Sequence, residues 1–215
     1  MMMQMLRALL ITMLCGCGYV HAQHEERIGW ETYHAGFGLK EGIYADFVAF
    51  RLNEPTVPKE RLRDGDGLSV TDIRRVVSKL SWQPDTGGVS TIRKDQLWGF
   101  CQNDAVYIAA GNGFYRLGLV GSLSHMLYEL SYRDWDPYMY PYGGVTRTIL
   151  AQQMLDMETG AFLPFNASGM AQALQHDPVL LEEFNALPKK QRNKDETVFR
   201  FLRMYNERNP LRFPR

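Results

Sequence analysis

Two pairs of side chains in this sequence could take part in catalysis, and the first is a thiol with an imidazole. Cys101 and His125 form this pair, because the other cysteines, Cys15 and Cys17, lie close to the N-terminus. A thiolate nucleophile needs a nearby histidine and an exposed, electropositive setting. Cys101 instead follows Trp98-Gly99-Phe100 in an apolar run, where cysteine usually packs as a small hydrophobic residue. The pattern favours core packing, with a catalytic Cys101 as the alternative.

The second pair is made of two carboxylates, Asp134 and Asp136, which flank Trp135. Two acids beside an aromatic ring are typical of glycoside hydrolases, in which they act as acid and as base or nucleophile. Asp136 is followed by proline, however, and Asp-Pro is also ordinary turn chemistry. We therefore expect a turn. An exported hydrolase that uses Cys101/His125 or Asp134/Asp136 is the alternative function.

Other signatures of catalytic and metal sites are missing from the sequence. The histidines beyond the N-terminal segment never pair at i+3 or i+4, and there is no H-E-x-x-H or C-x-x-C motif. Neither a G-x-S-x-G elbow nor a phosphate-binding glycine loop is present. We therefore expect no metal, no cofactor and no catalytic residue.

The most informative surface feature is the segment 132–144, which holds five aromatic residues, two prolines and a terminal glycine pair. Such a composition predicts a loop rather than a strand. Tyrosine and tryptophan rings in a loop supply rigid contact area with a polar tip, which suits a protein interface or the face of a sugar. The pattern favours a loop that folds back so that its rings cover an open end of a barrel, with a binding surface as the alternative. The candidate binding residues are Trp135, Tyr138, Tyr140 and Tyr142.

Charge and composition exclude several classes of function. The 24 basic residues balance the 24 acidic ones, and 45% of the residues are hydrophobic. This composition is that of a globular protein rather than a disordered one, and it offers no electrostatic attraction for nucleic acid. We expect no nucleic-acid partner.

The N-terminus indicates export. Arg7 precedes a short apolar run at 8–14, and Val20-His21-Ala22 resembles a signal-peptidase site. The run is shorter than the roughly 20 residues that span a membrane, and no later stretch reaches that length, so we expect no transmembrane helix in the mature chain. The expected product is periplasmic or secreted. Leu14-Cys15-Gly16-Cys17 also resembles a lipobox, so a lipid anchor on Cys17 to the cell envelope is the alternative.

Short strands must position the residues of the middle of the chain. Apolar runs bounded by turn residues predict strands at 42–44, 97–101, 105–109, 114–119, 126–132, 147–157 and 161–165. Gln102-Asn103-Asp104 is typical of a hairpin turn. Asp46 is expected to cap a short helix at 47–52. Residues 69–82 are ambiguous, and we interpret them as a helical turn near 70–74 and a hairpin that pairs 76–82 with 88–93.

The last third of the chain changes to a helical period. Asn166 or Ser168 can cap a helix that ends near 175, and Asp177-Pro178 can open another over 179–187, before a polar break at 188–194. A final helix ends at Asn209-Pro210. It carries an apolar stripe that should pack on the sheet, with Val198, Phe201, Leu202 and Tyr205 at i, i+3, i+4 and i+7.

These elements predict an α+β fold, in which a curved antiparallel β-meander, barrel- or sandwich-like, has C-terminal helices packed on it. The expected organisation is a signal peptide over 1–22 and a single exported domain over 23–215. That domain should be β-rich to about 165 and helical over 166–210.

Several short motifs resemble a family of uncharacterised small exported proteins from Bacteroidetes. They are Gly42-Ile43-Tyr44 with Phe47, Phe50 and Asn53-x-Pro55; Trp98-Gly99-Phe100-Cys101 with Val106-Tyr107-Ile108; Phe114-Tyr115-x-Leu117; Asp156-x-Glu158-Thr159-Gly160; and 205–210. The similarity covers residues 40 to 212 and implies export and this architecture, but no catalytic residues. We therefore expect a cell-envelope protein of unknown biochemical activity. It would be a non-enzymatic binding or structural module whose aromatic loop contacts an envelope protein or a glycan.

Overall fold

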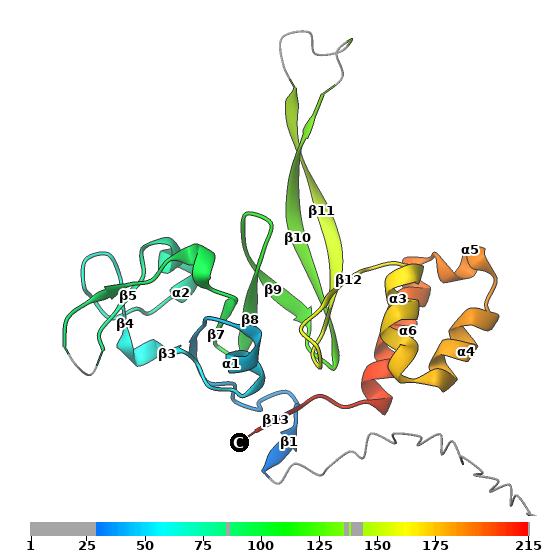
Figure 1. Cartoon of the computed structure of the whole chain (residues 1–215), viewed down its shortest axis with the longest axis horizontal. Coiled ribbons are helices and arrows are strands. Elements are labelled where there is room, and N and C mark those ends of the chain that lie inside the picture. The colour runs from blue at the N-terminus through cyan, green and yellow to red at the C-terminus, as the bar shows by residue number, and fades with distance from the viewer. Residues whose placement is uncertain (1–28, 85–86, 136–137, 139–143, 215) are drawn as a thin grey trace, which may run out of the picture.

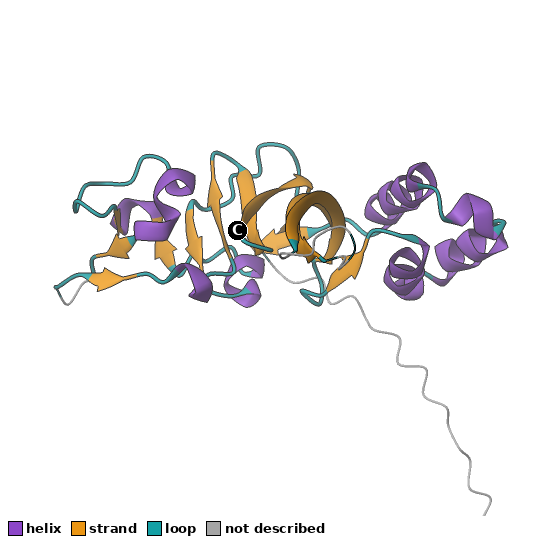
Figure 2. Cartoon of the chain, turned by 90° about the horizontal axis from the view of Figure 1, so that it is seen from above, coloured by secondary structure: helices purple, strands orange, loops and turns teal. Residues whose placement is uncertain are grey.

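The computed structural model of the protein describes residues 29–84, 87–135, 138 and 144–214. Within them the chain forms one large antiparallel sheet, two small sheets and a group of C-terminal helices. The helices gather beside one end of the large sheet, and a three-stranded sheet lies at the other end (Figures 1 and 2). The fold is α+β, which confirms the fold class predicted from the sequence.

The large sheet has eight strands in the order β12-β11-β10-β9-β8-β7-β2-β3, and its neighbouring strands are antiparallel. The strands are β2 (Gly42–Tyr44), β3 (Val57–Pro58), β7 (Gly99–Gln102), β8 (Ala105–Ala110), β9 (Gly113–Leu119), β10 (Leu123–Asp134), β11 (Val145–Asp156) and β12 (Phe162–Pro164). The meander from β7 to β12 follows the predicted strands. The sheet is open, since β12 and β3 are its edges, so it does not close into a barrel.

Local turn chemistry explains the first hairpin of the meander. Asn103 and Asp104 both adopt positive φ, at 50° and 55°. Asparagine and aspartate tolerate this left-handed conformation better than most residues, and it gives a two-residue turn the twist of its flanking strands. The turn between β7 and β8 is therefore the predicted one.

The β10–β11 hairpin is much longer than its neighbours. Twelve consecutive residue pairs join its strands, from Leu123↔Asp156 to Asp134↔Val145. Strand β9 pairs with β10 only at His125 and Met126, and β12 pairs with β11 only at 153–155. The outer part of the hairpin projects from the sheet as a two-stranded ribbon (Figure 1). We call residues 127–134 and 145–152 the arm.

The arm corrects the predicted loop at 132–144. Tyr132, Arg133 and Asp134 belong to β10, where they pair with Arg147, Thr146 and Val145. The prolines and glycines that suggested a loop all lie beyond Asp134. Cross-strand pairing with the β-branched residues of β11 therefore carries the strand further than local composition predicts.

The three-stranded sheet corrects another expectation. It consists of β4 (Leu62–Arg63), β5 (Ser81–Trp82) and β6 (Ser90–Thr91), and β5 pairs with β6 as predicted. The strand expected over 76–82 is reduced to two residues, however, because α2 (Ile73–Val76) and the 3₁₀ turn η2 (Val77–Lys79) precede it. Asp72 caps α2 through the Arg74 amide at 3.1 Å. Ile73 at the start of α2 and Leu80, an extended residue just after η2, are both fully buried, so they fix the two ends of the helical segment in the third core.

The helices begin where the capping residues predicted. The Asn166 side chain accepts from the Gly169 amide at 2.9 Å, and Asp177 accepts from the Leu180 amide at 3.2 Å. The elements are α3 (Ala167–Ala173), η4 (Leu174–His176), α4 (Pro178–Ala186), α5 (Lys189–Arg192) and α6 (Asp195–Arg208). The break expected at 188–194 thus contains a short helix. Near the N-terminus, Asp46 caps α1 (Phe47–Arg51) as predicted, and the 3₁₀ turns η1 (Lys59–Arg61) and η3 (Lys94–Gln96) lie further along the chain.

One small sheet was not predicted. Strand β1 (Trp30–Thr32) pairs with β13 (Arg212–Pro214), so segments near the two ends of the chain lie side by side. The Phe213 ring packs 5.5 Å from that of Phe37 and 5.4 Å from that of Phe50, measured between ring centroids. Each strand has three residues, too few to show a period, so the sequence alone could not reveal this pairing.

Three hydrophobic cores hold the elements together. The helical core contains the four stripe residues of α6 together with Leu123 and Met154 of the hairpin, as the sequence predicted for helices packed on the sheet. The central core contains Met126 and Leu155 of the same hairpin, and a third core lies around Ile43, Ile73 and Phe100. The root of the β10–β11 hairpin therefore lies between two cores and contributes side chains to both.

In the part of the chain that the structure describes, no helix has both the length and the apolar character needed to cross a membrane.

Candidate functional site

The root of the arm is fixed by a polar chain that begins at His125 of β10. Its Nε2 lies 3.0 Å from Oε1 of Gln152, whose amide nitrogen donates to Asp195 of α6 at 3.0 Å. The rings of Phe165 and Phe199 each pack edge-on at 4.8 Å from the imidazole. Burial lowers the pKa of His125, against the opposing influence of Gln152 and Asp195. The imidazole is a neutral structural group that links the hairpin to α6.

The structure does not bring Cys101 and His125 together. Cys101 is fully buried in the central core, while the described contacts of His125 lie with Gln152 and the two phenylalanines. Burial, aided by the charges of Glu41 and Asp104, raises the pKa of the Cys101 thiol to about 12. The thiol therefore stays protonated at neutral pH, and its geometry gives no support to a cysteine nucleophile.

The two candidate acids cannot be compared as a pair, since Asp136 lies outside the described residues. Asp134 forms an ion pair with Arg147, with Nε and Oδ2 2.6 Å apart. The two residues are diagonal neighbours on one face of the hairpin, so this pair links the strands near the end of the arm. Asp134 thus has a structural partner.

The aromatic residues at the tip of the arm are exposed where the structure describes them. The exposed fraction is 65% for Trp135 and 96% for Tyr138. Rings with this much exposure do not cover an end of the sheet, so the expectation that they fold back onto it is wrong for these two residues. Tyr140 and Tyr142, the other two candidates, lie outside the described residues, as do the predicted signal peptide and Cys17.

One face of the arm continues the apolar surface of the central core toward the tip. On this face the cross-strand pairs run from buried Met126 through Tyr128↔Ala151 and Leu130↔Ile149 to Tyr132↔Arg147 and Asp134↔Val145. Leu130, Tyr132, Val145 and Ile149 are exposed, and we call them the apolar strip. On the other face, Leu127 and Leu150 are the exposed large apolar residues beside polar ones such as Ser131 and Thr148. Exposed apolar side chains in such an array are typical of interaction surfaces.

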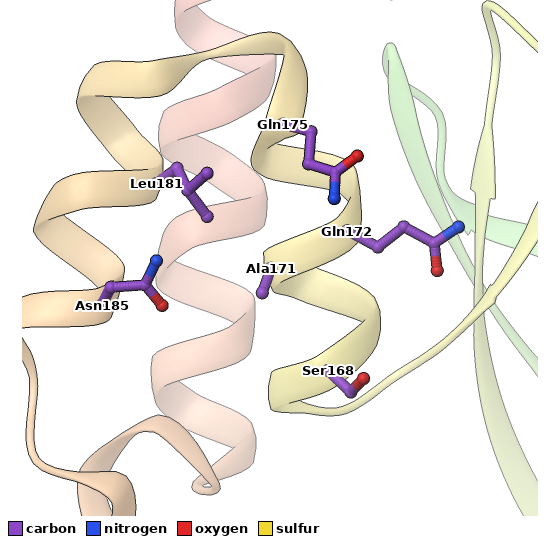
Figure 3. Close-up of a pocket in the computed structure, with 6 residues that line it drawn as sticks. All are labelled: Ser168, Ala171, Gln172, Gln175, Leu181 and Asn185. Atoms are coloured by element: carbon purple, nitrogen blue, oxygen red, sulfur yellow. The ribbon is translucent and has the colours of Figure 1, made fainter.

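A groove of about 500 Å³ lies between α3 and α4, in the helical part of the molecule. Figure 3 shows Leu181 and Asn185 of α4 on one side of it, facing Ala171 of α3. The remaining lining residues are Ser168, Gln172 and Gln175. None of the six side chains is ionisable, so the groove has no general acid or base.

A second groove, of about 560 Å³, contains acidic residues beside the edge of the large sheet. Its lining includes Glu41, which pairs with Lys59 and accepts from the Asn103 amide at 2.6 Å. Burial opposes ionisation of Glu41, but these hydrogen bonds outweigh it and hold its pKa below the ordinary value. The carboxylate of Glu41 therefore has structural partners within the fold. Among the described residues no group of three His, Cys, Asp or Glu side chains is arranged to hold a metal ion.

No protein-family model matches this chain, and the comparisons with curated proteins and with solved structures gave no match either. Function therefore has to be inferred from the residues themselves.

The sequence pointed to the tip but missed the arm. A signal was present at 145–152, which reads Val-Thr-Arg-Thr-Ile-Leu-Ala-Gln without glycine or proline. Such a run is typical of a strand. This run could not show that the strand would project from the sheet. The projection depends on how many residues of the hairpin pair with the neighbouring strands β9 and β12.

Proposed function

We propose that this protein is an exported, non-enzymatic binding module of the cell envelope, and that the tip of its arm is the recognition element. The main support for this function is the position of Trp135 and Tyr138. Their rings are exposed at the end of a hairpin that is anchored between two cores. Rigid aromatic side chains lose little entropy when they bind, and they suit a protein surface or the face of a sugar.

The candidate catalytic groups support the non-enzymatic part of this proposal. Cys101 is a buried thiol with a raised pKa, and His125 has a structural hydrogen bond to Gln152. Export is supported by the N-terminal sequence and by the resemblance to exported proteins. Intact-mass measurement of the exported protein tests whether it is released as a soluble protein or anchored by a lipid. A mass that starts at Gln23 indicates soluble export, and one that starts at acylated Cys17 indicates a lipid anchor.

Co-sedimentation with envelopes isolated from the producing cells tests the recognition element. The double variant Trp135→Ala/Tyr138→Ala should lower the retained fraction at least tenfold relative to the unmodified chain. Leu68→Ala/Val89→Ala is the matched control, because both residues are highly exposed but belong to the region of the three-stranded sheet. The proposal is wrong if the two double variants are retained equally.

Digestion of the envelopes before the assay separates the two partner classes. Loss of retention after protease treatment indicates an envelope protein. Loss after digestion of the polysaccharide indicates a glycan. Retention that survives both treatments contradicts the proposal, because it leaves neither predicted partner in place.

A further inference from the structure

Among the described residues, the outer edge of β11 has no partner strand over most of its length. One edge of the strand pairs with β10 throughout, and on the other edge β12 covers only Gln153, Met154 and Leu155. Within the described residues, nothing pairs with that edge from Val145 to Gln152. An open edge presents a row of backbone donors and acceptors, which is a template for another extended strand.

This edge lacks the devices that usually prevent strand pairing. Soluble proteins protect exposed edges with proline, lysine, bulges or very short strands. Residues 145–152 contain no proline, glycine or lysine, and their single charge, Arg147, is paired with Asp134. The opposite edge of the arm is better protected, because β10 carries the charged residues Glu129 and Arg133 in addition to the paired Asp134.

A two-stranded ribbon is also an incomplete structural unit. Isolated hairpins are marginally stable in water, and three or more strands with a covered apolar face are needed for independent stability. The arm leaves Leu130 and Ile149 exposed side by side on one face. A further strand along β11 would extend the ribbon and cover part of this pair.

We propose that β11 pairs antiparallel with β11 of a second copy of this chain, about a two-fold axis near Ile149. The free edge runs from Val145 to Gln152, because β12 pairs with β11 from Gln153 onward. Two symmetric seven-residue segments fit within it, 145–151 about Thr148 and 146–152 about Ile149. We choose the second, because it places the apolar Ile149 side chains of the two copies opposite each other. The two arms together form a four-stranded ribbon with the two bodies at opposite ends.

This register is compatible with every side chain on the edge. Antiparallel pairing about Ile149 places Ile149 opposite its own copy and Arg147 opposite Ala151 of the second copy. No like charges therefore face each other, which would destabilise the pairing. On the face of the apolar strip, Leu130 and Ile149 of one copy meet Ile149 and Leu130 of the other, and a continuous apolar row crosses the seam.

The arm exposes large apolar side chains on both of its faces. They are Leu130, Tyr132, Val145 and Ile149 on the face of the apolar strip, and Leu127 and Leu150 on the other face. Edge pairing joins the apolar strips of the two copies across the seam, so the dimer covers apolar surface that a single copy leaves in water.

Light scattering during gel filtration of the chain from residue 23 onward tests the dimer. The unmodified chain should be a dimer at micromolar concentration. Thr148→Lys should weaken dimerisation at least tenfold, because lysine on an edge strand opposes pairing. Ser131→Lys is the matched control, since Ser131 is the cross-strand partner of Thr148 on the protected strand and either change removes the same 2.9 Å hydrogen bond. A monomeric unmodified chain, or equal weakening by both lysines, overturns the proposal.

Cysteine cross-linking gives a second readout that does not depend on the lysine variants folding. A two-fold axis near Ile149 brings Ile149→Cys within disulfide distance of its own copy, whereas Leu130→Cys on β10 is one strand further away. Only Ile149→Cys should form a covalent dimer under mild oxidation, and buried Cys101 in the unmodified chain sets the background. Absence of this cross-link overturns the register. Trp135→Ala/Tyr138→Ala should remain dimeric, so failure of the tip proposal and failure of this one are distinguishable.

Discussion

Met154 and Leu155 are consecutive residues of β11, yet their side chains enter different cores. Met154 lies in the helical core and Leu155 in the central core, and both are fully buried. Alternation along a strand directs successive side chains to opposite faces of a sheet. The root of the hairpin therefore ties the helices to the rest of the molecule, and it gives the arm a rigid base.

Truncation of either residue should be costly. Met154→Ala and Leu155→Ala are each expected to lower the free energy of unfolding by about 2–5 kcal/mol, as large-to-small changes in cores do. Leu68→Ala is the control outside the hairpin, and because Leu68 is 64% exposed it should change this free energy by less than about 0.5 kcal/mol. Urea unfolding followed by circular dichroism measures all three. Similar losses for Leu68→Ala and Met154→Ala would contradict the two-core arrangement.

Asp177 joins α4 to α6 and should make stability sensitive to acid. It caps α4 through the Leu180 amide and accepts from the Arg208 guanidinium at 2.6 and 3.2 Å. Burial by itself would raise the pKa of Asp177, but these hydrogen bonds outweigh it and hold the pKa below its ordinary value of 3.8. The stabilisation is therefore complete above pH 4 and is lost as the pH falls through the lowered pKa.

Two substitutions separate the cap of α4 from the ion pair. Asp177→Asn keeps a capping acceptor and loses the charge, whereas Asp177→Ala loses both, so the alanine variant should be less stable at neutral pH by about 0.5–2 kcal/mol. Both variants should lose less stability than the unmodified chain between pH 5 and pH 2. Thermal melts across this range provide the measurement. An unchanged acid sensitivity in both variants would rule out Asp177 as its source.

His125 should produce a separate loss of stability at mildly acidic pH. Burial lowers its pKa below the ordinary value of 6.5, so the unfolded chain binds the proton more readily than the folded one. Stability is then lost as the pH falls from about 6.5 through the lowered pKa. His125→Gln removes the titrating group and should flatten this part of the pH profile. His34→Gln is the control and should keep the loss, because hydrogen bonding to the Ala35 carbonyl and to Glu31 shifts the pKa of His34 in the opposite direction.

Phe213 should contribute as much to stability as residues of the central meander, although only Pro214 and Arg215 follow it in the sequence. Its ring is fully buried between Phe37, Phe50 and Tyr33, and the Arg51 guanidinium lies 5.1 Å from its centroid. Phe213→Ala should lower the free energy of unfolding by about 3–5 kcal/mol. Phe162→Ala, in the edge strand β12 and partly exposed, should lower it less. Chemical denaturation of the two variants compares them directly.

Elements that depend on neighbouring residues could be predicted from the sequence, and those that depend on distant ones could not. The α6 stripe, the caps at Asp46, Asn166 and Asp177, and the β7–β8 turn follow from local spacing and turn chemistry. The pairing of β1 with β13 joins segments about 180 residues apart and left no local signal. The same limit applies to the site: composition identified the aromatic tip, but only the register of β10 with β11 shows that it stands on a long arm.

Removal of the two aromatic rings at the tip should cost little stability. Trp135 and Tyr138 are 65% and 96% exposed, so the double variant Trp135→Ala/Tyr138→Ala should change the free energy of unfolding by less than about 1 kcal/mol. Rings that packed against the sheet would cost several times as much, since aromatic truncations in cores cost about 3–5 kcal/mol each. Phe50→Ala is the comparison, because Phe50 is buried and stacks at 4.8 Å on Trp98. Thermal and urea melts of the two variants decide between these readings. A loss from the tip variant as large as that from Phe50→Ala would mean that the rings stabilise the fold, and the tip would then no longer be a candidate for recognition.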